Sequence, residues 1–507
     1  IGLKKCPLKV GEISIDLDTV FDHQVNQWMF VTLAPVTITS KNDLIDLMGK
    51  ISDNKIVFTV PKNGSYQLLI GGLETGSVVK SVTFAAPGNS GPVLDHFNKS
   101  ALINYFNRFS QALVEKFGPE LGNLIFSFFV DSVELSGSDW TSDMPEIFKS
   151  RNGYDIMPYL PFIGYPTEHQ GYCANDLRFT KTFQDTIKRV RYDYSNTLAE
   201  LFTERFVKTF DDWCKKHDVK SKYQPYGMPF LFDMIEGAMI PDIPESNGYL
   251  FSSYPYWHGY NVWNKYTSSG AHLAGKNIVS CEAMTNTQGV FRATLDMIKR
   301  ADDMNFIMGI NHAVVHGYNY SPPEAGFPGW VRFGTYFSEY NTWWPYVNAW
   351  TSYHARLSTV FTQAEPIGEI AILAPQADVW SECGLARQPF QTQPLYANQL
   401  WEPLQQLGFN TDYINERIIT EATKINGQLH FGPMEYPYLV LAGVKSINLE
   451  TANAISKFVE NGGTLLVIGT IPYRTPSLTT KNDDQRIIEI FNSLKGKDSF
   501  HHLPEPD

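Results

Sequence analysis

The fold is decided by the apolar stretch Leu124-Ile125-Phe126-Ser127-Phe128-Phe129-Val130, which passes at once into Asp131-Ser132-Val133-Glu134. A short, continuous apolar run bounded by polar residues is typical of a strand whose two faces are both buried. Comparable runs occupy residues 219–224, 277–281 and 310–315, and each of them ends in polar or glycine-rich sequence. These runs predict a parallel sheet with polar side chains at its carboxyl edge.

Helical patterns separate the strand-like runs. Residues 99–116 and 185–217 show the apolar spacing of helices. The alternation predicts an α/β fold, a (β/α)8 barrel of the TIM type, over residues 85–365. Only four or five strands can be assigned between residues 91 and 364, whereas a closed barrel needs eight. We therefore expect an incomplete barrel here, with its remaining strands nearer the start of the chain or upstream of Ile1.

Two further regions flank the predicted barrel. Residues 1–84 hold short β-type runs separated by Pro, Gly, Asn and Asp turns, which predict a β-rich region followed by a Gly/Pro-rich hinge. Residues 366–507 alternate buried strand-like runs with helices, which predicts a small doubly wound α/β domain of the flavodoxin or Rossmann type. No glycine-rich nucleotide fingerprint follows its first strand, so we expect an accessory role.

The composition argues against several classes of partner. The 507 residues carry a formal net charge of −12 with acidic and basic residues mixed, so no basic stripe predicts nucleic-acid binding. No apolar run of about 18 residues predicts a membrane span. The five cysteines are widely separated and form no Cys-x-x-Cys pair, which indicates neither a disulfide framework nor a zinc site.

Two glutamates stand where predicted strands open into loops. Glu134 closely follows the run at 124–130, and Glu282 follows the strand-like residues 277–279. Because the carboxyl ends of barrel strands converge, both side chains can face one pocket. Glycoside hydrolysis needs such a pair, one carboxylic acid to protonate the leaving oxygen and one carboxylate to activate water or attack. The alternative is that either glutamate is an ordinary surface or helix-capping residue.

Other polar residues lie near the same predicted edge. The Pro-bracketed segment 241–245 reads as a rigid loop in which Asp242 and Glu245 are candidates for binding sugar hydroxyls or a hard cation such as calcium, or belong to a solvated turn. His312 and His316 have helical metal-ligand spacing, but the valines between them favour a strand, where they lie roughly 13 Å apart. They then do not share a metal. At least one of them can hydrogen-bond a substrate at the strand's end.

Aromatic and amide-rich loops surround these positions. Flat rings cover the apolar face of a sugar, while amides and hydroxyls bind its hydroxyl groups. Ordinary core packing remains the alternative for about half of these rings. The loops and strand ends supply the predicted substrate-binding residues, which are Asp131, Trp140, Tyr226, Trp257, His312, His316, Tyr318 and Trp330.

Several of these stretches resemble glycoside hydrolase family 106, the α-L-rhamnosidases. The resemblance runs in order from about residue 85 to 472, on Ala85-Ala86-Pro87-Gly88, Asp131-Ser132-Val133-Glu134, Asp139-Trp140-Thr141, Arg151-Asn152-Gly153-Tyr154-Asp155, Asp242-Ile243-Pro244-Glu245, Ser280-Cys281-Glu282, Gly309-Ile310-Asn311-His312 and Pro328-Gly329-Trp330. Val133 stands where an aromatic residue is common in that family, and the family's terminal β-sandwiches have no counterpart before Asp507.

The resemblance implies a (β/α)8 barrel and an inverting, exo-acting hydrolysis of terminal α-L-rhamnosides in an oligo- or polysaccharide. It implies that Glu134 and Glu282 form the catalytic pair, and that Glu245 is a calcium or sugar ligand. A polysaccharide-degrading enzyme of this kind is expected to be secreted or periplasmic. The alternatives are hydrolysis of another glycoside, such as a galactoside or uronide, and a non-catalytic carbohydrate-binding protein.

Overall fold

The computed structural model describes most of the chain. The described residues are 2–7, 10–20, 25–62, 64–73, 94–133, 139–163, 178–225, 233–251, 262–286, 291–318, 320–330, 334–383 and 396–506. None of the helices among them is long and apolar enough to cross a membrane.

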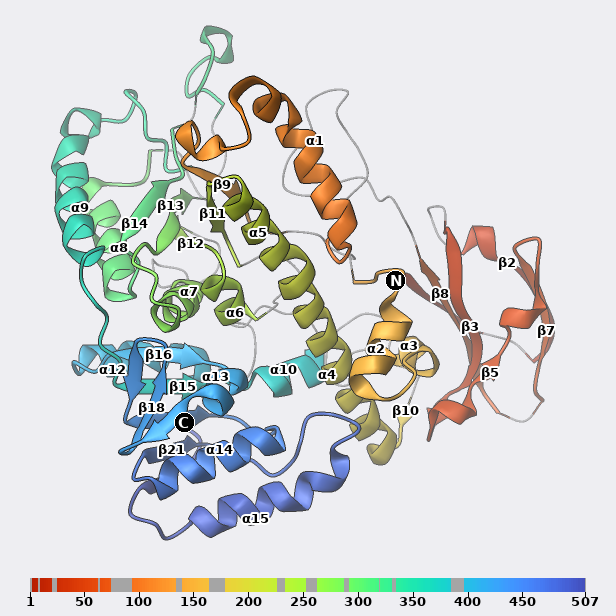
Figure 1. The fold of residues 1–507 in the computed structure, drawn as a ribbon. Coiled ribbons are helices and arrows are strands. Elements are labelled where there is room, and N and C mark those ends of the chain that lie inside the picture. Colours follow the sequence, from red (N-terminus) through yellow and green to blue (C-terminus); the bar gives the residue numbers. More distant parts are fainter. Residues whose placement is uncertain are drawn as a thin grey trace.

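A five-stranded parallel sheet forms the centre of the molecule (Figure 1). We call it the half-barrel sheet. Its strands, in order across the sheet, are β14 (His312–Val315), β13 (Ser280–Asn286), β12 (Ile243–Phe251), β11 (Lys220–Tyr223) and β9 (Ser127–Val130). The four predicted strands are all present, although β13 begins three residues later than its apolar run. The structure therefore confirms an α/β fold with a parallel sheet, in half-barrel form.

The middle strand β12 corrects one prediction. Residues 241–245 read as a rigid loop, but Ile243 begins a central strand that pairs with β11 on one side and β13 on the other. Pro244 has no N–H to give to the sheet, and proline is tolerated at the start of a strand, which is where it lies.

Helices cover the outer face of the half-barrel sheet. They are α1 (Lys99–Phe117), α4 (Lys181–Phe202), α5 (Lys208–Lys216), α6 (Met234–Met239), α7 (Val262–Leu273), α8 (Leu295–Ile307) and α9 (Val347–Phe361), with α2 (Met144–Asn152) and α3 (Leu160–Ile163) beside α4. The predicted helix at 185–217 is α4 continued through one π-helical segment into α5. Cys281 and Ala283 of β13 pack in one core cluster with Ile298 and Trp350. Their neighbours in the strand, Ser280 and Glu282, therefore point to the opposite, inner face.

A second parallel sheet lies below the half-barrel sheet in Figure 1. Its order is β16 (Thr411–Ile414), β15 (Ile370–Leu373), β20 (Tyr438–Ala442), β21 (Thr464–Ile468) and β22 (Phe500–Leu503), which is the 2-1-3-4-5 order of flavodoxin-like folds. Its helices are α10 (Gln376–Cys383), α11 (Tyr396–Gln399), α12 (Trp401–Gln406), α13 (Glu416–Glu421), α14 (Leu449–Glu460) and α15 (Asp484–Leu494), and β17 (Thr423–Ile425), β18 (Gln428–Phe431) and β19 (Met434–Tyr436) form a small antiparallel addition. This part of the chain therefore contains a parallel sheet with helices between its strands.

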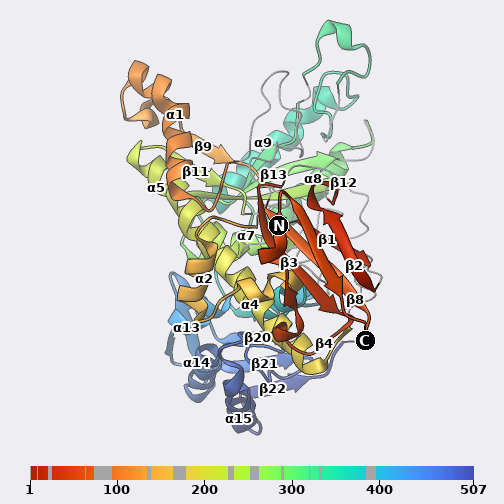
Figure 2. The same cartoon turned by 90° about the vertical axis from the view of Figure 1, so that its right-hand side faces the viewer.

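The start of the chain forms two antiparallel sheets, which stand at the right of Figure 1. One contains β1 (Gly2–Pro7), β8 (Tyr66–Leu73), β3 (Gln27–Pro35) and β5 (Ile45–Asp46), and the other β2 (Gly11–Asp16), β7 (Lys55–Val60) and β6 (Ile51–Ser52). Both contribute to one small core, with Val31 and Ile70 from the first sheet and Phe58 from the second. β4 (Thr37–Ile38) pairs with β10 (Arg178–Phe179) beside α4 (Figure 2).

A buried arginine joins α4 to the segment of chain that follows strand β21 of the second sheet. The Arg189 side chain is 2% exposed, and its guanidinium pairs with Asp185 at 3.1 Å and Asp484 at 2.6 Å. It also donates to the backbone carbonyl of Thr475 at 2.7 Å. Each carboxylate and carbonyl is thus matched by a fixed donor, which is the condition for burying a charge without a large penalty.

We expect Arg189→Met to destabilise the protein by about 1–3 kcal/mol, because the Thr475 carbonyl loses its buried donor while Asp185 and Asp484 each lose one of several partners. The melting temperature, followed by circular dichroism, would fall by several degrees. Lys208→Met is the control, since the Lys208 side chain is 63% exposed and contacts Asp212 only at 3.5 Å. Equal melting temperatures for the two variants would contradict this role for Arg189.

Candidate active site

Polar side chains gather at the carboxyl edge of the half-barrel sheet. Asp131 directly follows β9, Gln224 follows β11 and His316 follows β14. Glu245 and Glu282 project from the central strands β12 and β13. Strands of one parallel sheet end on the same edge, and in barrel enzymes that edge carries the chemistry.

Glu282 is held by three side chains. Gln224 Nε2 donates to Glu282 Oε2 at 3.0 Å, and Thr285 Oγ1 donates to Oε1 at 2.8 Å. His316 Nδ1 lies 3.0 Å from the same Oε1. The Glu282 side chain remains 19% exposed. The carboxylate is therefore fixed in orientation but still reachable from solvent.

These contacts set the ionisation of Glu282. Burial alone would raise the pKa of this carboxyl, but hydrogen bonds from His316, Gln224 and Thr285, with the charge of His316, lower it to about 2. The hydrogen bond to Glu282 in turn raises the pKa of His316 above its ordinary value. Glu282 is consequently ionised at neutral pH, and it can accept a proton but has none to donate.

Glu245 lies deeper and is bound to the protein itself. It is 1% exposed, Lys222 Nζ contacts its Oε2 at 2.5 Å and Ser280 Oγ donates to the same oxygen at 2.5 Å. Gln224 Nε2 donates to its other oxygen at 3.1 Å while also reaching Glu282. Burial raises the pKa of Glu245, and the Lys222 ammonium opposes that rise. Gln224 thus bridges an internal ion pair and the more exposed Glu282.

This arrangement does not fit the expected calcium ligand. Calcium takes six to eight oxygen ligands, whereas both oxygens of Glu245 already accept hydrogen bonds and a cationic ammonium lies against one of them. Asp242 lies just before β12 and accepts from the Ser221 backbone at 3.1 Å, at the amino end of the sheet. Within the described ranges, no group of three or more His, Cys, Asp or Glu side chains is arranged to hold a metal ion.

Asp131 belongs electrostatically to the Glu282 site. Burial raises the pKa of Asp131 and the Glu282 charge raises it further, while the backbone hydrogen bond from Ser132 at 2.7 Å and the charges of His316 and Lys222 lower it. Its net pKa is above the ordinary value. A carboxyl group that keeps its proton more readily than its neighbour therefore lies beside the ionised Glu282.

The structure places the other predicted binding residues in different surroundings. His312 is the first residue of β14 and not its last, but it pairs with Ser280, which donates to Glu245. Burial and the Lys222 charge lower the pKa of His312, so it lies near the Lys222–Glu245 pair. Trp140 is half-buried and packs against a core cluster, so most of its ring is unavailable for stacking on a sugar. Tyr318 and Trp330 are 59% and 66% exposed in the segment after β14, with Phe327 between them at 77%.

Three predicted site residues, Glu134, Tyr226 and Trp257, lie outside the described residues. Conversely, no role was predicted for Lys222, Thr285 or Gln224, although Gln224 ends the strand-like run at 219–224. The position of Gln224 at the end of a predicted strand was a usable signal. The Lys222–Glu245 pair depends on the register between β11 and β12, which the sequence did not reveal.

An ionised glutamate at the carboxyl edge of a barrel-type parallel sheet, with a second carboxyl group beside it, defines the class of glycosidase-like α/β proteins. Within that class the chain belongs to glycoside hydrolase family 106, described as alpha-L-rhamnosidase, whose model matches residues 17–503.

Two relatives illustrate the match. A putative beta-glucuronidase from Formosa agariphila is 26% identical over 470 residues, covering 91% of this chain and 36% of that protein. The solved structure of a rhamnosidase from Novosphingobium sp. PP1Y is 22% identical and superimposes with a TM-score of 0.64, covering 92% of this chain and 43% of that one. The chain thus spans less than half the length of these relatives.

We expect the stability contributed by Glu282 to depend on pH. The pKa of Glu282, about 2, lies below the ordinary value near 4.3. Its contribution to stability is therefore complete above the ordinary value of about 4.3 and is lost as the pH falls toward 2. The difference between the melting temperatures of the wild type and Glu282→Gln should therefore decrease between pH 5 and pH 3. This is about the pH range in which a free carboxyl titrates. A difference independent of pH would show that the carboxylate is not held as described.

The Glu245 ion pair leads to a separate expectation. Glu245→Gln leaves the 12% exposed Lys222 ammonium without its carboxylate, so the melting temperature should fall. Calcium or a chelator should not alter the difference between this variant and the wild type. Glu324→Gln, at an exposed position, is the matched control. A calcium-dependent stabilisation seen in the wild type and absent from Glu245→Gln would restore Glu245 as a metal ligand.

Proposed function

We propose that this chain is the catalytic part of an exo-acting glycoside hydrolase that cleaves terminal α-L-rhamnosides. The observation that carries the proposal is Glu282, an ionised and accessible carboxylate fixed by Gln224, Thr285 and His316 at the carboxyl edge of the half-barrel sheet. Family membership supports the substrate class, and a (β/α)8 barrel is the fold we propose for the complete catalytic unit.

Glu282 is the general base in this proposal. A carboxylate with a pKa of about 2 cannot supply the proton that the leaving oxygen needs, but it can orient a water molecule and accept its proton. His316, whose pKa the Glu282 contact raises, stays protonated more readily and keeps the carboxylate in place. The water attacks the anomeric carbon from the face opposite the leaving group, which inverts the configuration.

Glu134 is the general acid that we assign to the reaction. It lies three residues beyond Asp131 in the sequence. The carboxyl of Asp131 is close enough to Glu282 for the Glu282 charge to raise its pKa. The raised pKa of Asp131, to which desolvation and the Glu282 charge both contribute, is the condition a general acid needs, so Asp131 itself is the alternative acid. Otherwise Asp131 binds a sugar hydroxyl, with the exposed rings of Tyr318 and Trp330 as stacking surfaces toward the rest of an oligo- or polysaccharide.

A uronide is the second candidate substrate. The Formosa agariphila relative is named as a putative beta-glucuronidase. The Lys222 ammonium lies on the inner face and contacts Glu245 at 2.5 Å. It could bind a sugar carboxylate only if that carboxylate replaced Glu245. That exchange costs a buried ion pair, so the rhamnoside is the better supported substrate. A secreted or periplasmic location would suit either activity.

Glu→Gln variants with substrates of different leaving-group ability test the two roles. On a 4-nitrophenyl α-L-rhamnoside, we expect Glu282→Gln to lose at least about a thousandfold in kcat, because no base remains. Glu134→Gln should lose much less on a 2,4-dinitrophenyl rhamnoside, whose leaving group needs no protonation, than on an alkyl rhamnoside. If Asp131 is the acid, Asp131→Asn and not Glu134→Gln will show that dependence.

The stereochemistry and substrate class have their own measurement. Proton NMR of the first-formed sugar should show the anomer opposite to that of the substrate. A panel of aryl rhamnoside, galactoside and glucuronide should give the highest kcat/KM for the rhamnoside. Near wild-type turnover by Glu282→Gln on every member of the panel would overturn the proposed mechanism, and binding without turnover by the wild type would indicate a carbohydrate-binding protein.

A further inference from the structure

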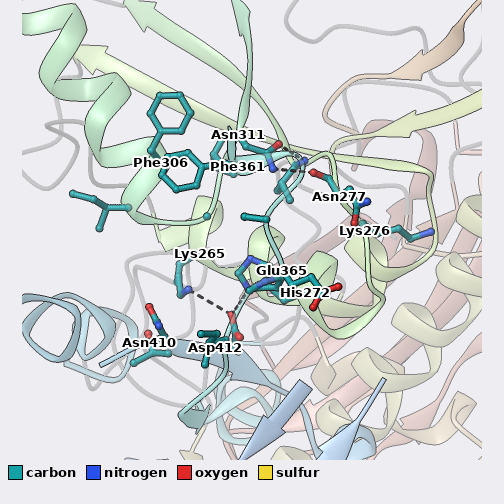
Figure 3. A pocket seen from close by; sticks show the side chains of 18 of the residues that line it. Lys265, His272, Lys276, Asn277, Phe306, Asn311, Phe361, Glu365, Asn410 and Asp412 are labelled. Atoms are coloured by element: carbon teal, nitrogen blue, oxygen red, sulfur yellow. Dashed lines mark hydrogen bonds and ion pairs between the residues drawn. The ribbon is translucent and has the colours of Figure 1, made fainter. Parts of the chain in front are cut away.

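A cavity of about 430 Å³ lies between the two parallel sheets, at the end of the half-barrel sheet opposite Glu282 (Figure 3). Val279 and Ile310, which precede β13 and β14, line the cavity together with Lys265 and His272 of α7. Thr411 and Asp412 of β16 also line it. The volume lies within the roughly 300–1,000 Å³ range of small-molecule sites, which often occur where two folding units meet.

The cavity holds a buried ammonium with few acceptors. Lys265 is 3% exposed, and its Nζ reaches only Asp412 Oδ1, at 3.4 Å, among the described residues. Asp412 has other partners as well: His272 Nδ1 lies 2.9 Å from its Oδ1, and the Tyr436 hydroxyl donates to its Oδ2 at 3.0 Å. An ammonium has three N–H donors, and burying it is costly unless they are used. Lys265 therefore has N–H donors available for a further acceptor.

A second polar group points to the same conclusion. Thr411 is 1% exposed, and its Oγ1 has no hydrogen-bond partner in the part of the chain that the structure describes. A buried hydroxyl without a protein partner is destabilising, so such groups mark places where water or a ligand bonds to the protein. Both unmet donors, the Lys265 ammonium and the Thr411 hydroxyl, line one cavity.

The opposite wall of the cavity is aromatic and aliphatic. Phe306 and Phe361 lie together in Figure 3, with ring centroids 5.4 Å apart, away from the Lys265–Asp412 pair. Phe361 is 41% exposed and Ile367 is 71% exposed, so apolar side chains stand at the solvent side. The cavity thus combines a buried cationic end with an open apolar end.

We propose that this cavity binds a small aromatic carboxylic acid. Its carboxylate would accept hydrogen bonds from Lys265 and Thr411, and its ring would pack against Phe306 and Phe361. A phosphate-bearing ligand fits less well, because the Asp412 carboxylate beside Lys265 would repel a second full negative charge. The site is separate from Glu282, and its existence does not depend on the glycosidase proposal.

Benzoate and benzamide are the matched probes, since they share a ring and a planar head group but only benzoate is charged. We expect calorimetry on the full chain at pH 7 to give benzoate a Kd at least about tenfold lower than that of benzamide. Addition of benzoate should raise the melting temperature in proportion to its occupancy. No binding of either probe at 10 mM, or equal binding of both, would overturn the proposal and leave the cavity filled with water.

Two variants distinguish a ligand site from a structural gap. Thr411→Val replaces the unpartnered hydroxyl with a methyl group, so its unliganded melting temperature should be unchanged or higher, while benzoate binding weakens about fivefold or more. Phe361→Ala changes a half-exposed ring and should weaken benzoate and benzamide alike. If Thr411→Val retains the wild-type affinity for benzoate, the hydroxyl is not part of a binding site and the proposal fails.

Discussion

The candidate active site depends on one side chain, the amide of Gln224, which donates to Glu245 and Glu282 at the same time. Carboxylates in neighbouring strands would repel each other and share a proton if nothing lay between them. The Gln224 amide, together with the Lys222 ammonium on Glu245 and His316 on Glu282, compensates each charge separately. Two ionised glutamates can therefore occupy the inner face of one sheet, with only Glu282 left accessible.

The sequence predicted the parts of the fold that follow a simple hydrophobic pattern. The runs ending near Val130 and Val315 became β9 and β14, because a continuous apolar run is typical of a strand in a parallel sheet. β12 was missed because its outer face is polar. Ser246 donates to Asn264 of α7, and Asn264 donates to Asn305 of α8 at 2.9 Å, so hydrogen bonds replace apolar packing there.

The same reasoning explains which site residues could be found. His316 follows β14, as its position after an apolar run predicted. Glu282 was predicted where a strand opens into a loop, but it is the third residue of β13, which continues to Asn286. The role of Glu245 was not readable, since whether it faces a cation or Lys222 is decided by how β12 aligns with β11. His312 lies at the start of β14 because that strand begins two residues later than the apolar run at 310–315, and hydrophobicity defines such a boundary only to within a few residues.

The contact between Tyr266 of α7 and Tyr413 of β16, stacked with ring centroids 4.5 Å apart, joins the two parallel sheets. Both rings belong to one hydrophobic cluster that also contains Met234 and Leu465. A polypeptide divided near residue 365 would expose this shared interior on both halves. The modular appearance of the chain, with a barrel-type unit followed by a flavodoxin-like one, is therefore a feature of its topology, while the shared hydrophobic cluster makes the stability of each unit depend on the other.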